Sequence, residues 1–130
     1  MPKRTLTLKV TIPPYESPRS LWRKEIHKAV VEQEVKTGVR YTPEDRLEVI
    51  VRIYLDDKKL QSIEVDNRLK DILDALQGRA DGTRRVATMK PIVPNDRQIY
   101  RVTIEKMKPP GQRHGLGHLV VRKYHSRLKH

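Results

Sequence analysis

EVDNRLKDILDALQG, residues 64–78, is the stretch that decides the fold, because it predicts the end of a strand followed directly by an amphipathic helix. The helix is predicted from apolar side chains that recur at i, i+3, i+4 and i+7 and form one stripe: Leu69, Ile72, Leu73 and Leu76. Gly78 follows the stripe, at a position where helices commonly end. Such a helix requires a sheet or a second helix to cover its apolar face.

The start of this helix concentrates charged side chains. If a strand ends here, Glu64 and Asp66 point to the same side, because alternate residues of a strand share a face. Lys70 lies about one helical turn beyond Asp66, at the edge of the apolar stripe. An ionised cluster beside a core is typical of a functional site, so we interpret this stretch as the candidate active centre.

The length of 130 residues predicts a single domain, 1–130, with a modest core. The formal net charge is +12, and it is uneven: residues 1–46 carry +4, residues 47–78 carry −2 and residues 79–130 carry +10. Basic flanks predict a polyanionic partner, because Lys and Arg release phosphate counterions when they bind. An acidic centre between them suggests a cation held against that polyanion. The alternative is surface charge that serves only solubility.

The composition excludes several classes of protein. The chain has no cysteine, which excludes disulfides, thiolate metal sites and a cysteine nucleophile. Its first residues lack the apolar region of a secretory signal, and no apolar run approaches the length that spans a membrane. We therefore expect a soluble, cytoplasmic protein without a membrane partner.

Two strands and a helix are predicted before the central stretch. Residues 5–12 alternate apolar and polar side chains, as a half-buried strand does. A helix is predicted that is capped by Ser17 or Ser20, runs to about Lys36 and has Trp22 as its core anchor. Residues 47–55 predict a central strand, because both of its faces carry apolar side chains. Residues 56–59 are interpreted as a charged turn.

Two more strands are predicted after residues 64–78. Residues 98–106 alternate with Tyr100, Val102 and Ile104 inward, and residues 119–123 are expected to pair with them as a hairpin. The order β-α-β-α-β-β predicts an α+β fold, a two-layer sandwich with a mixed sheet and helices on one face.

Residues 77–96 form the least regular part of the chain, and we interpret them as a functional loop that folds locally in part. This loop and the later turn at 108–117 are basic. We expect them to contact DNA phosphates without reading base sequence, through Arg79, Arg84, Arg85, Lys90 and Arg113.

The charged residues together resemble the RusA family of Holliday-junction resolvases. The matching motifs are Asp66-Asn67, a lysine four residues after that aspartate (Lys70), Asp74-Ala75-Leu76 in the same helix and, downstream, Asn95-Asp96-Arg97-Gln98-Ile99. In that family the corresponding motifs are Asp-x-Asp-Asn, a lysine, Asp-Ala-Leu and Asp-Asp-x-Gln-Val. Glu64 stands where the family has its first aspartate, and Asn95 replaces the first residue of the downstream pair.

The resemblance implies a homodimeric, Mg²⁺-dependent endodeoxyribonuclease that cuts four-way DNA junctions in recombination and repair. It assigns metal binding to Glu64, Asp66 and Asp96 and catalysis to these three residues and Lys70. Asn67 is expected to brace the backbone or a carboxylate.

The chemistry of phosphodiester hydrolysis fits the same residues. Mg²⁺ neutralises phosphate charge and activates water when carboxylates hold it with coordination positions left open. Glu64, Asp66 and Asp96 can supply those oxygens only if Asp96 approaches the start of the central helix, and a strand beginning near Gln98 would bring it there. Lys70 would act as a point charge on a phosphate oxygen.

Each residue also has a purely structural interpretation. Asp66 could cap the helix, Lys70 could pair with Asp66 or Asp74 on the surface, and Asp96 could belong to a turn. Asp71 and Asp74 are interpreted as solvated, with Asp74 close enough to Lys70 to support it.

Two other functions remain open for the whole chain. One is a non-catalytic basic nucleic-acid-binding protein, a binder of junctions or RNA. The other is a RusA-like protein that binds junctions but has lost cleavage, which the Glu64 substitution keeps open.

Overall fold

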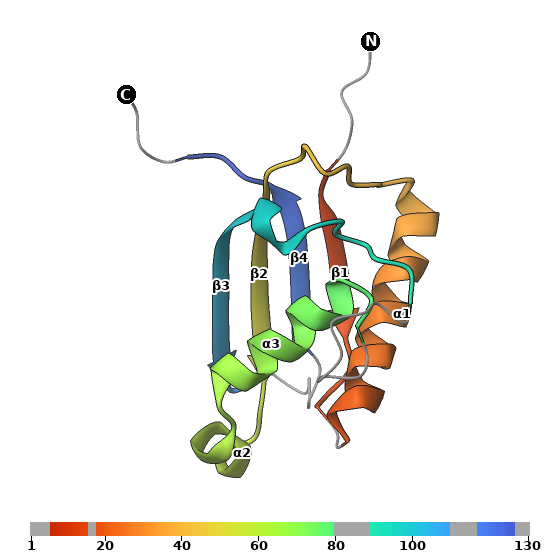
Figure 1. The fold of residues 1–130 in the computed structure, drawn as a ribbon. Coiled ribbons are helices and arrows are strands. Elements are labelled where there is room, and N and C mark those ends of the chain that lie inside the picture. Colours follow the sequence, from red (N-terminus) through yellow and green to blue (C-terminus); the bar gives the residue numbers. More distant parts are fainter. Residues whose placement is uncertain (1–5, 16–17, 80–88, 110–116, 127–130) are drawn as a thin grey trace.

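The computed structural model describes residues 6–15, 18–79, 89–109 and 117–126. Figure 1 shows a layer of helices in front of one sheet, so the predicted α+β fold is confirmed. In chain order the elements are β1 (Leu8–Ile12), α1 (Arg19–Thr37), β2 (Leu47–Tyr54), α2 (Asp57–Ser62), α3 (Val65–Leu76), the 3-10 helix η1 (Asp96–Gln98), β3 (Ile99–Met107) and β4 (Gly117–Lys123).

The sheet is mixed and has the strand order β1-β4-β2-β3. β4 is antiparallel to both β1 and β2, whereas β2 and β3 run parallel. The prediction that β2 is central is therefore confirmed, but the predicted hairpin of the last two strands is wrong. Leu119 and Val121 of β4 are fully buried and require a neighbour on each side, whereas Tyr100 and Val102 of β3 are exposed at the sheet edge instead of pointing inward.

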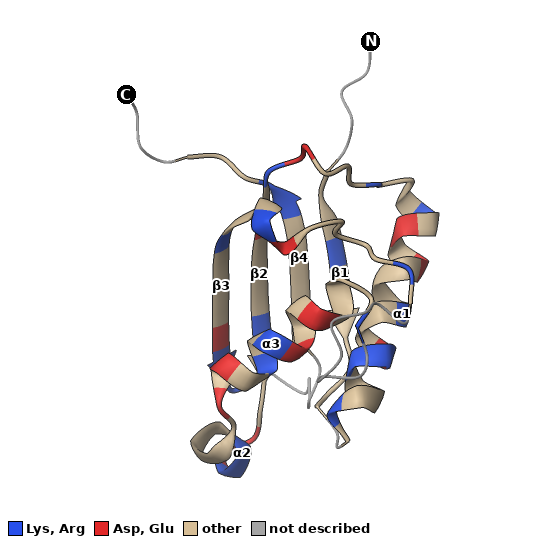
Figure 2. Ribbon diagram, in the orientation of Figure 1, with Lys and Arg blue, Asp and Glu red and all other residues tan. Residues whose placement is uncertain are grey.

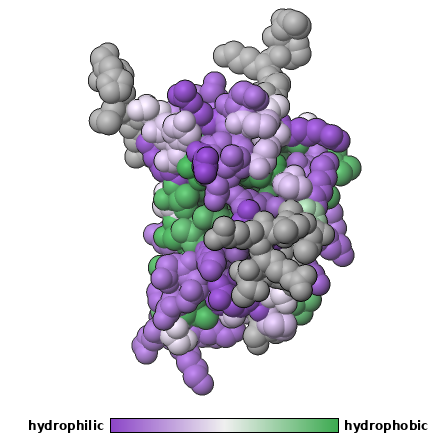
Figure 3. Space-filling view, in the orientation of Figure 1, coloured by the Kyte–Doolittle hydropathy of each residue, from purple (hydrophilic) through white to green (hydrophobic). Residues whose placement is uncertain are grey.

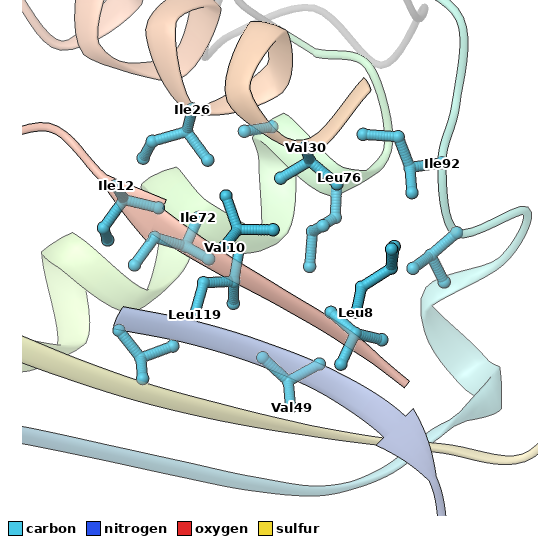
Figure 4. Packing of buried hydrophobic residues seen from close by; sticks show 14 of the residues in the cluster. Leu8, Val10, Ile12, Ile26, Val30, Val49, Ile72, Leu76, Ile92 and Leu119 are labelled. Atoms are coloured by element: carbon cyan, nitrogen blue, oxygen red, sulfur yellow. The ribbon is translucent and has the colours of Figure 1, made fainter. Parts of the chain in front are cut away.

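The core lies between the sheet and the two long helices, α1 and α3 (Figure 4). Alternate residues of the three strands β1, β2 and β4 face these helices, as period two requires. Trp22 is 2% exposed, and its indole Nε1 donates a hydrogen bond to the Pro13 carbonyl at 2.9 Å, which confirms it as the core anchor. None of the helices in the described ranges is both long and apolar enough to cross a bilayer.

The buried face of α3 is rotated from the predicted apolar stripe. Leu69 and Leu73 are only half-buried, while two charged residues lie on the buried side: Arg68, Asp71, Ile72, Ala75 and Leu76 are the buried positions. The charged turn predicted at residues 56–59 is wrong, because residues from Asp57 onward form the short helix α2. The polar sequence of α2, DKKLQS, carries no apolar stripe that would have indicated a helix.

The described ends of the 77–96 segment pack against the C-terminus of α3. The backbone N–H groups of Ile92 and Val93 both donate to the Leu76 carbonyl, and both side chains are buried. Gly78 adopts a φ of 76°, in the left-handed region that favours glycine. The local folding predicted for this segment is therefore present in residues 89–95.

Candidate functional site

The N-terminal end of α3 presents three charged side chains to solvent: Glu64, Asp66 and Lys70. Glu64 is the N-cap residue, but its side chain makes no capping hydrogen bond. Instead, the Asn67 Nδ2 donates to the Glu64 Oε2 at 2.6 Å, so Asn67 braces a carboxylate as predicted. We call Glu64, Asp66, Asn67 and Lys70 the α3 site.

The backbone conformation of the α3 site differs from the predicted one. Val65 is already the first helical residue, so no strand ends at Glu64 and alternation along a strand does not align the two carboxylates. The structural alternatives also differ from what is observed. Asp66 lies inside the first turn and does not occupy the cap position, and among the described residues Lys70 forms no ion pair with Asp66 or Asp74.

Asp96 lies at the other end of the sheet from the α3 site. It begins η1, directly before β3, whereas Lys106 near the end of β3 donates to the Ile63 carbonyl at 2.8 Å, beside the start of α3. The strand from Ile99 to Lys106 spans roughly 23 Å at about 3.3 Å per residue. Figure 1 shows the same separation, with η1 at the top and the start of α3 at the lower left. The prediction that Asp96 approaches Glu64 and Asp66 within one chain is wrong, because the parallel pairing of β2 and β3 places their starts together.

The residues around Asp96 have a structural role that explains their pattern. The Gln98 Oε1 accepts from the Asn95 N–H at 2.8 Å, and the Gln98 Nε2 donates to the carbonyls of Thr42 and Asp45. Gln98 is 5% exposed, so these hydrogen bonds are sheltered. The segment thereby fixes the connection that precedes β2, while the Asp96 side chain stays exposed.

The acidic side chains that the structure brings together suit Mg²⁺ binding only in part. Among the described residues, no three acidic or histidine side chains lie close enough together to hold a metal ion. Glu64 and Asp66 provide two exposed carboxylates, two residues apart, at the start of one helix. Mg²⁺ is commonly held by one or two carboxylates together with water and substrate phosphate, so this smaller set is chemically sufficient.

A second group of charges lies where α3 packs against α1, and we call it the arginine–aspartate cluster: Arg19, Arg23, Arg68, Asp71 and Asp74. Asp71 is completely buried, so the prediction that it is solvated is wrong. The Nε atoms of Arg19 and Arg23 each donate to the Asp71 Oδ1 at 2.9 Å. Asp74 is 3.3 Å from the Arg23 Nη2, so it supports Arg23 of α1 and not Lys70.

The Arg68 guanidinium completes this cluster from within α3. Its Nη2 lies 3.3 Å from the Asp71 Oδ2, although neither that oxygen nor the Arg68 Nε has a hydrogen-bond partner of good geometry among the described residues. The guanidinium also lies 3.6 Å from the centre of the Tyr15 ring, in a cation–π contact. The spacing of Arg19 and Arg23, four residues apart on the helix that carries Trp22, was the sequence feature that could have indicated this cluster.

The cluster holds the start of α3 against α1. The Arg19 Nη2 lies 3.5 Å from the Asn67 carbonyl, so the same arginine that binds Asp71 also contacts the backbone of the α3 site. Figure 2 shows acidic residues both at the outer start of α3 and on its side toward α1, where basic residues face them. The two groups of acids on α3 are therefore in contrasting environments.

The predicted phosphate contacts are described only in part. Arg84, Arg85 and Arg113 lie outside the described residues. Arg79 is half-buried beside the end of α3, and Lys90 is exposed. Burial raises the pKa of Glu34, and the charge of Lys90 opposes this rise, so Lys90 lies close enough to α1 to interact with one of its acids.

No family model matches the chain, and no curated protein matches it in sequence. The resemblance to the RusA family therefore rests on the residues themselves: the acid, asparagine and lysine of the α3 site and the downstream segment around Asp96.

Proposed function

We propose that this protein is a Mg²⁺-dependent endodeoxyribonuclease that cuts four-way DNA junctions, acting as a homodimer in the cytoplasm. The observation that carries the proposal is the exposure of Glu64 and Asp66 without an ion pair among the described residues. Asp71, on the same helix, forms ion pairs with three arginines. The Asp66 Oδ1 accepts a hydrogen bond from the Asn67 N–H at 3.0 Å, and the Glu64 Oε2 accepts one from the Asn67 side chain. Neither carboxylate has a basic partner among the described residues, so the remaining lone pairs of both are available to bind a cation.

The residues of the α3 site have separate roles in this proposal. Mg²⁺, when bound, supplies neutralisation of phosphate charge and activation of water. Glu64 and Asp66 would hold the ion, and the hydrogen bond from Asn67 limits the conformations of the Glu64 side chain. Lys70, one turn along the helix, would place its ammonium on an oxygen of the scissile phosphate.

The charge of the chain supports DNA as the substrate. The formal net charge of +12 favours a polyanion, and the surplus lies outside the segment that contains the α3 site. A homodimer has the two-fold symmetry that a four-way junction approximates, so paired sites could cut opposed strands.

The test is cleavage of a synthetic four-way junction in Mg²⁺, followed by strand separation on a denaturing gel. We expect Asp66→Asn and Glu64→Gln to lower the cutting rate at least about 100-fold, because each removes a charged ligand from the metal, while junction binding persists. Asp96→Asn is the matched control: it makes the same chemical change outside the α3 site and should retain cutting.

Two outcomes would contradict the proposed site. Cutting that is unaffected by Asp66→Asn would show that this carboxylate holds no catalytic metal. Loss of cutting in Asp96→Asn that is restored by mixing this variant with Asp66→Asn would contradict a site complete within one chain, and would assign Asp96 to the site of a second copy.

A second candidate is a junction-binding protein without cleavage. The separation of Asp96 from Glu64 and Asp66 favours it, because the three-carboxylate site implied by the resemblance is not assembled within one chain. Junction binding without any cutting, in either Mg²⁺ or Mn²⁺, would establish this candidate in place of the nuclease.

A further inference from the structure

Three segments that are distant in sequence meet at the end of the sheet where β2 and β3 begin and β4 ends (Figure 1). The Tyr124 N–H, just after β4, donates to the Arg46 carbonyl, just before β2, at 2.8 Å. The Arg101 Nη1, in β3, lies 3.4 Å from the His125 carbonyl. These contacts hold the residues that follow β4 against the first residues of β2 and β3.

Four side chains from these segments form a row that we call the tyrosine–arginine ladder: Arg46, Tyr100, Tyr124 and Arg101. The Arg46 guanidinium lies 5.5 Å from the centre of the Tyr100 ring, and the Arg101 guanidinium lies 4.9 Å from the Tyr124 ring. The two rings are 5.4 Å apart and inclined by 40°. Each tyrosine therefore has a cation on one side and the other tyrosine beside it.

Tyr100 is the most exposed tyrosine or tryptophan side chain of the protein. All six aromatic residues lie in the described ranges, and Tyr100 is 53% exposed while the other five are buried or half-buried. Tyr100 also lies at a shift in the register between β2 and β3. The consecutive β2 residues Leu47 and Glu48 pair with Ile99 and Arg101, so the pairing skips Tyr100. Bulges of this kind redirect a side chain and are often found beside functional sites.

Grooves adjoin the ladder on both sides of Arg46. One has a volume of about 450 Å³ and is lined by Arg46, Tyr124 and Lys123, and the other, of about 190 Å³, is lined by Arg46, Tyr100 and Arg97. Two acids, Glu44 and Asp45, line both grooves, and the Asp45 Oδ2 accepts hydrogen bonds from Thr42.

The apolar edge of the sheet continues from the ladder. Val102 follows Tyr100 along β3 and is 37% exposed. In the space-filling view, hydrophobic surface gathers at the left, over β3, and the same strand carries two basic residues and one acidic residue (Figures 2 and 3). A surface of rings, arginines and half-exposed apolar side chains suits a ligand with flat apolar faces and negative charge.

We propose that the tyrosine–arginine ladder binds unpaired nucleotides of a DNA strand, with a base against the Tyr100 ring and the adjoining phosphates on Arg46 and Lys123. Bases within a duplex are already stacked on one another, whereas an unpaired base can stack on an exposed aromatic ring. Arginines beside the rings add cation–π and phosphate contacts. The inference rests on DNA as the substrate in the proposed function, but it does not depend on cleavage.

The test is fluorescence anisotropy of a labelled oligothymidylate of about 12 nucleotides, in EDTA, with a duplex of equal length for comparison. Tyr100→Leu should weaken binding of the single strand about tenfold, equivalent to about 1.4 kcal/mol for one stacked base, and should change duplex binding less than about twofold. Tyr100→Phe keeps the ring and should bind like the wild type. Arg46→Gln should weaken binding more than Lys36→Gln, a matched loss of one cation at the exposed end of α1.

Several results would overturn the ladder assignment. Equal single-strand binding by Tyr100→Leu and wild type, or an equal loss toward the single strand and the duplex, would show that the ring only packs against Tyr124. Tighter binding of oligouridylate than of oligothymidylate would overturn DNA as the ligand. A wild type that binds junctions but not the single strand would refute the ladder and leave the proposed function intact, whereas failure to bind either DNA would contradict both.

Discussion

The two faces of α3 carry acids in opposite environments. On the inner face, Asp71 is completely buried and contacts three arginines of the arginine–aspartate cluster. On the outer face, Glu64 and Asp66 are exposed, and they form no ion pair among the described residues. A buried carboxylate is tolerated only when it is paired, whereas an exposed one costs little and stays available to a ligand. The contrast separates the acids that hold α3 against α1 from the acids that we propose bind the metal.

The largest expected difference between the two faces is in stability. Asp71→Asn should lower the free energy of unfolding by about 3–5 kcal/mol, because it removes the counter-charge of the buried Arg68 and one of the two acids that pair with the buried Arg23. Asp66→Asn makes the same change on the outer face and should alter it by no more than about 0.5 kcal/mol. Urea unfolding followed by Trp22 fluorescence measures both. Equal stability of the two variants would contradict the division of roles between the faces.

The next largest expected effect is on catalytic activity, which should depend on Lys70 of the α3 site. Lys70→Ala should reduce junction cutting about 100-fold without changing the midpoint of urea unfolding, because we propose that its ammonium contacts the substrate and it forms no ion pair with a described residue. Lys58→Ala, which removes a cation from the exposed surface of α2, is the control. If both variants cut equally well, Lys70 has no part in the reaction.

The smallest expected effect extends the comparison to two acids of the sheet. Burial alone would raise the pKa of Glu48, but its hydrogen bond from Arg122 and the charges of Arg122 and Arg101 outweigh it and lower that pKa below 4.5. A lowered pKa in the folded state contributes stability above pH 4.5 that is lost as the pH falls through the lowered pKa. Glu48→Gln should therefore flatten the acid side of the stability profile, by at most about 1 kcal/mol. Glu105→Gln, at a more exposed ion pair, should flatten it less, and the reverse order would contradict this account.

Much of the fold could be predicted because hydrophobic periodicity encodes it locally. The alternation in β1 and β2 and the apolar positions of α1 around Trp22 each lie within one element. The position of β4 between β1 and β2 could not be predicted, since strand order depends on which edges bury the most apolar surface across the whole sheet.

The candidate site was predictable to a smaller extent. The residues at the start of α3 could be identified from their charge and spacing. The burial of Asp71 could not, because two of its three arginine partners lie about 50 positions earlier in the chain. Asp96 was expected beside the α3 site, and the parallel pairing of β3 with β2 instead places it at the opposite end of the sheet. Long-range pairing of this kind leaves no local pattern in sequence.

The most direct test of the central claim is to locate the metal on the protein by NMR. Trace Mn²⁺, which replaces Mg²⁺ at oxygen ligands, broadens the amide resonances near its site. We predict broadening at Glu64, Asp66 and Asn67 that disappears in Asp66→Asn, with the resonances of residues 96–99 unaffected. Broadening centred on Asp96, or none at the start of α3, would contradict the proposal that Glu64 and Asp66 hold the metal.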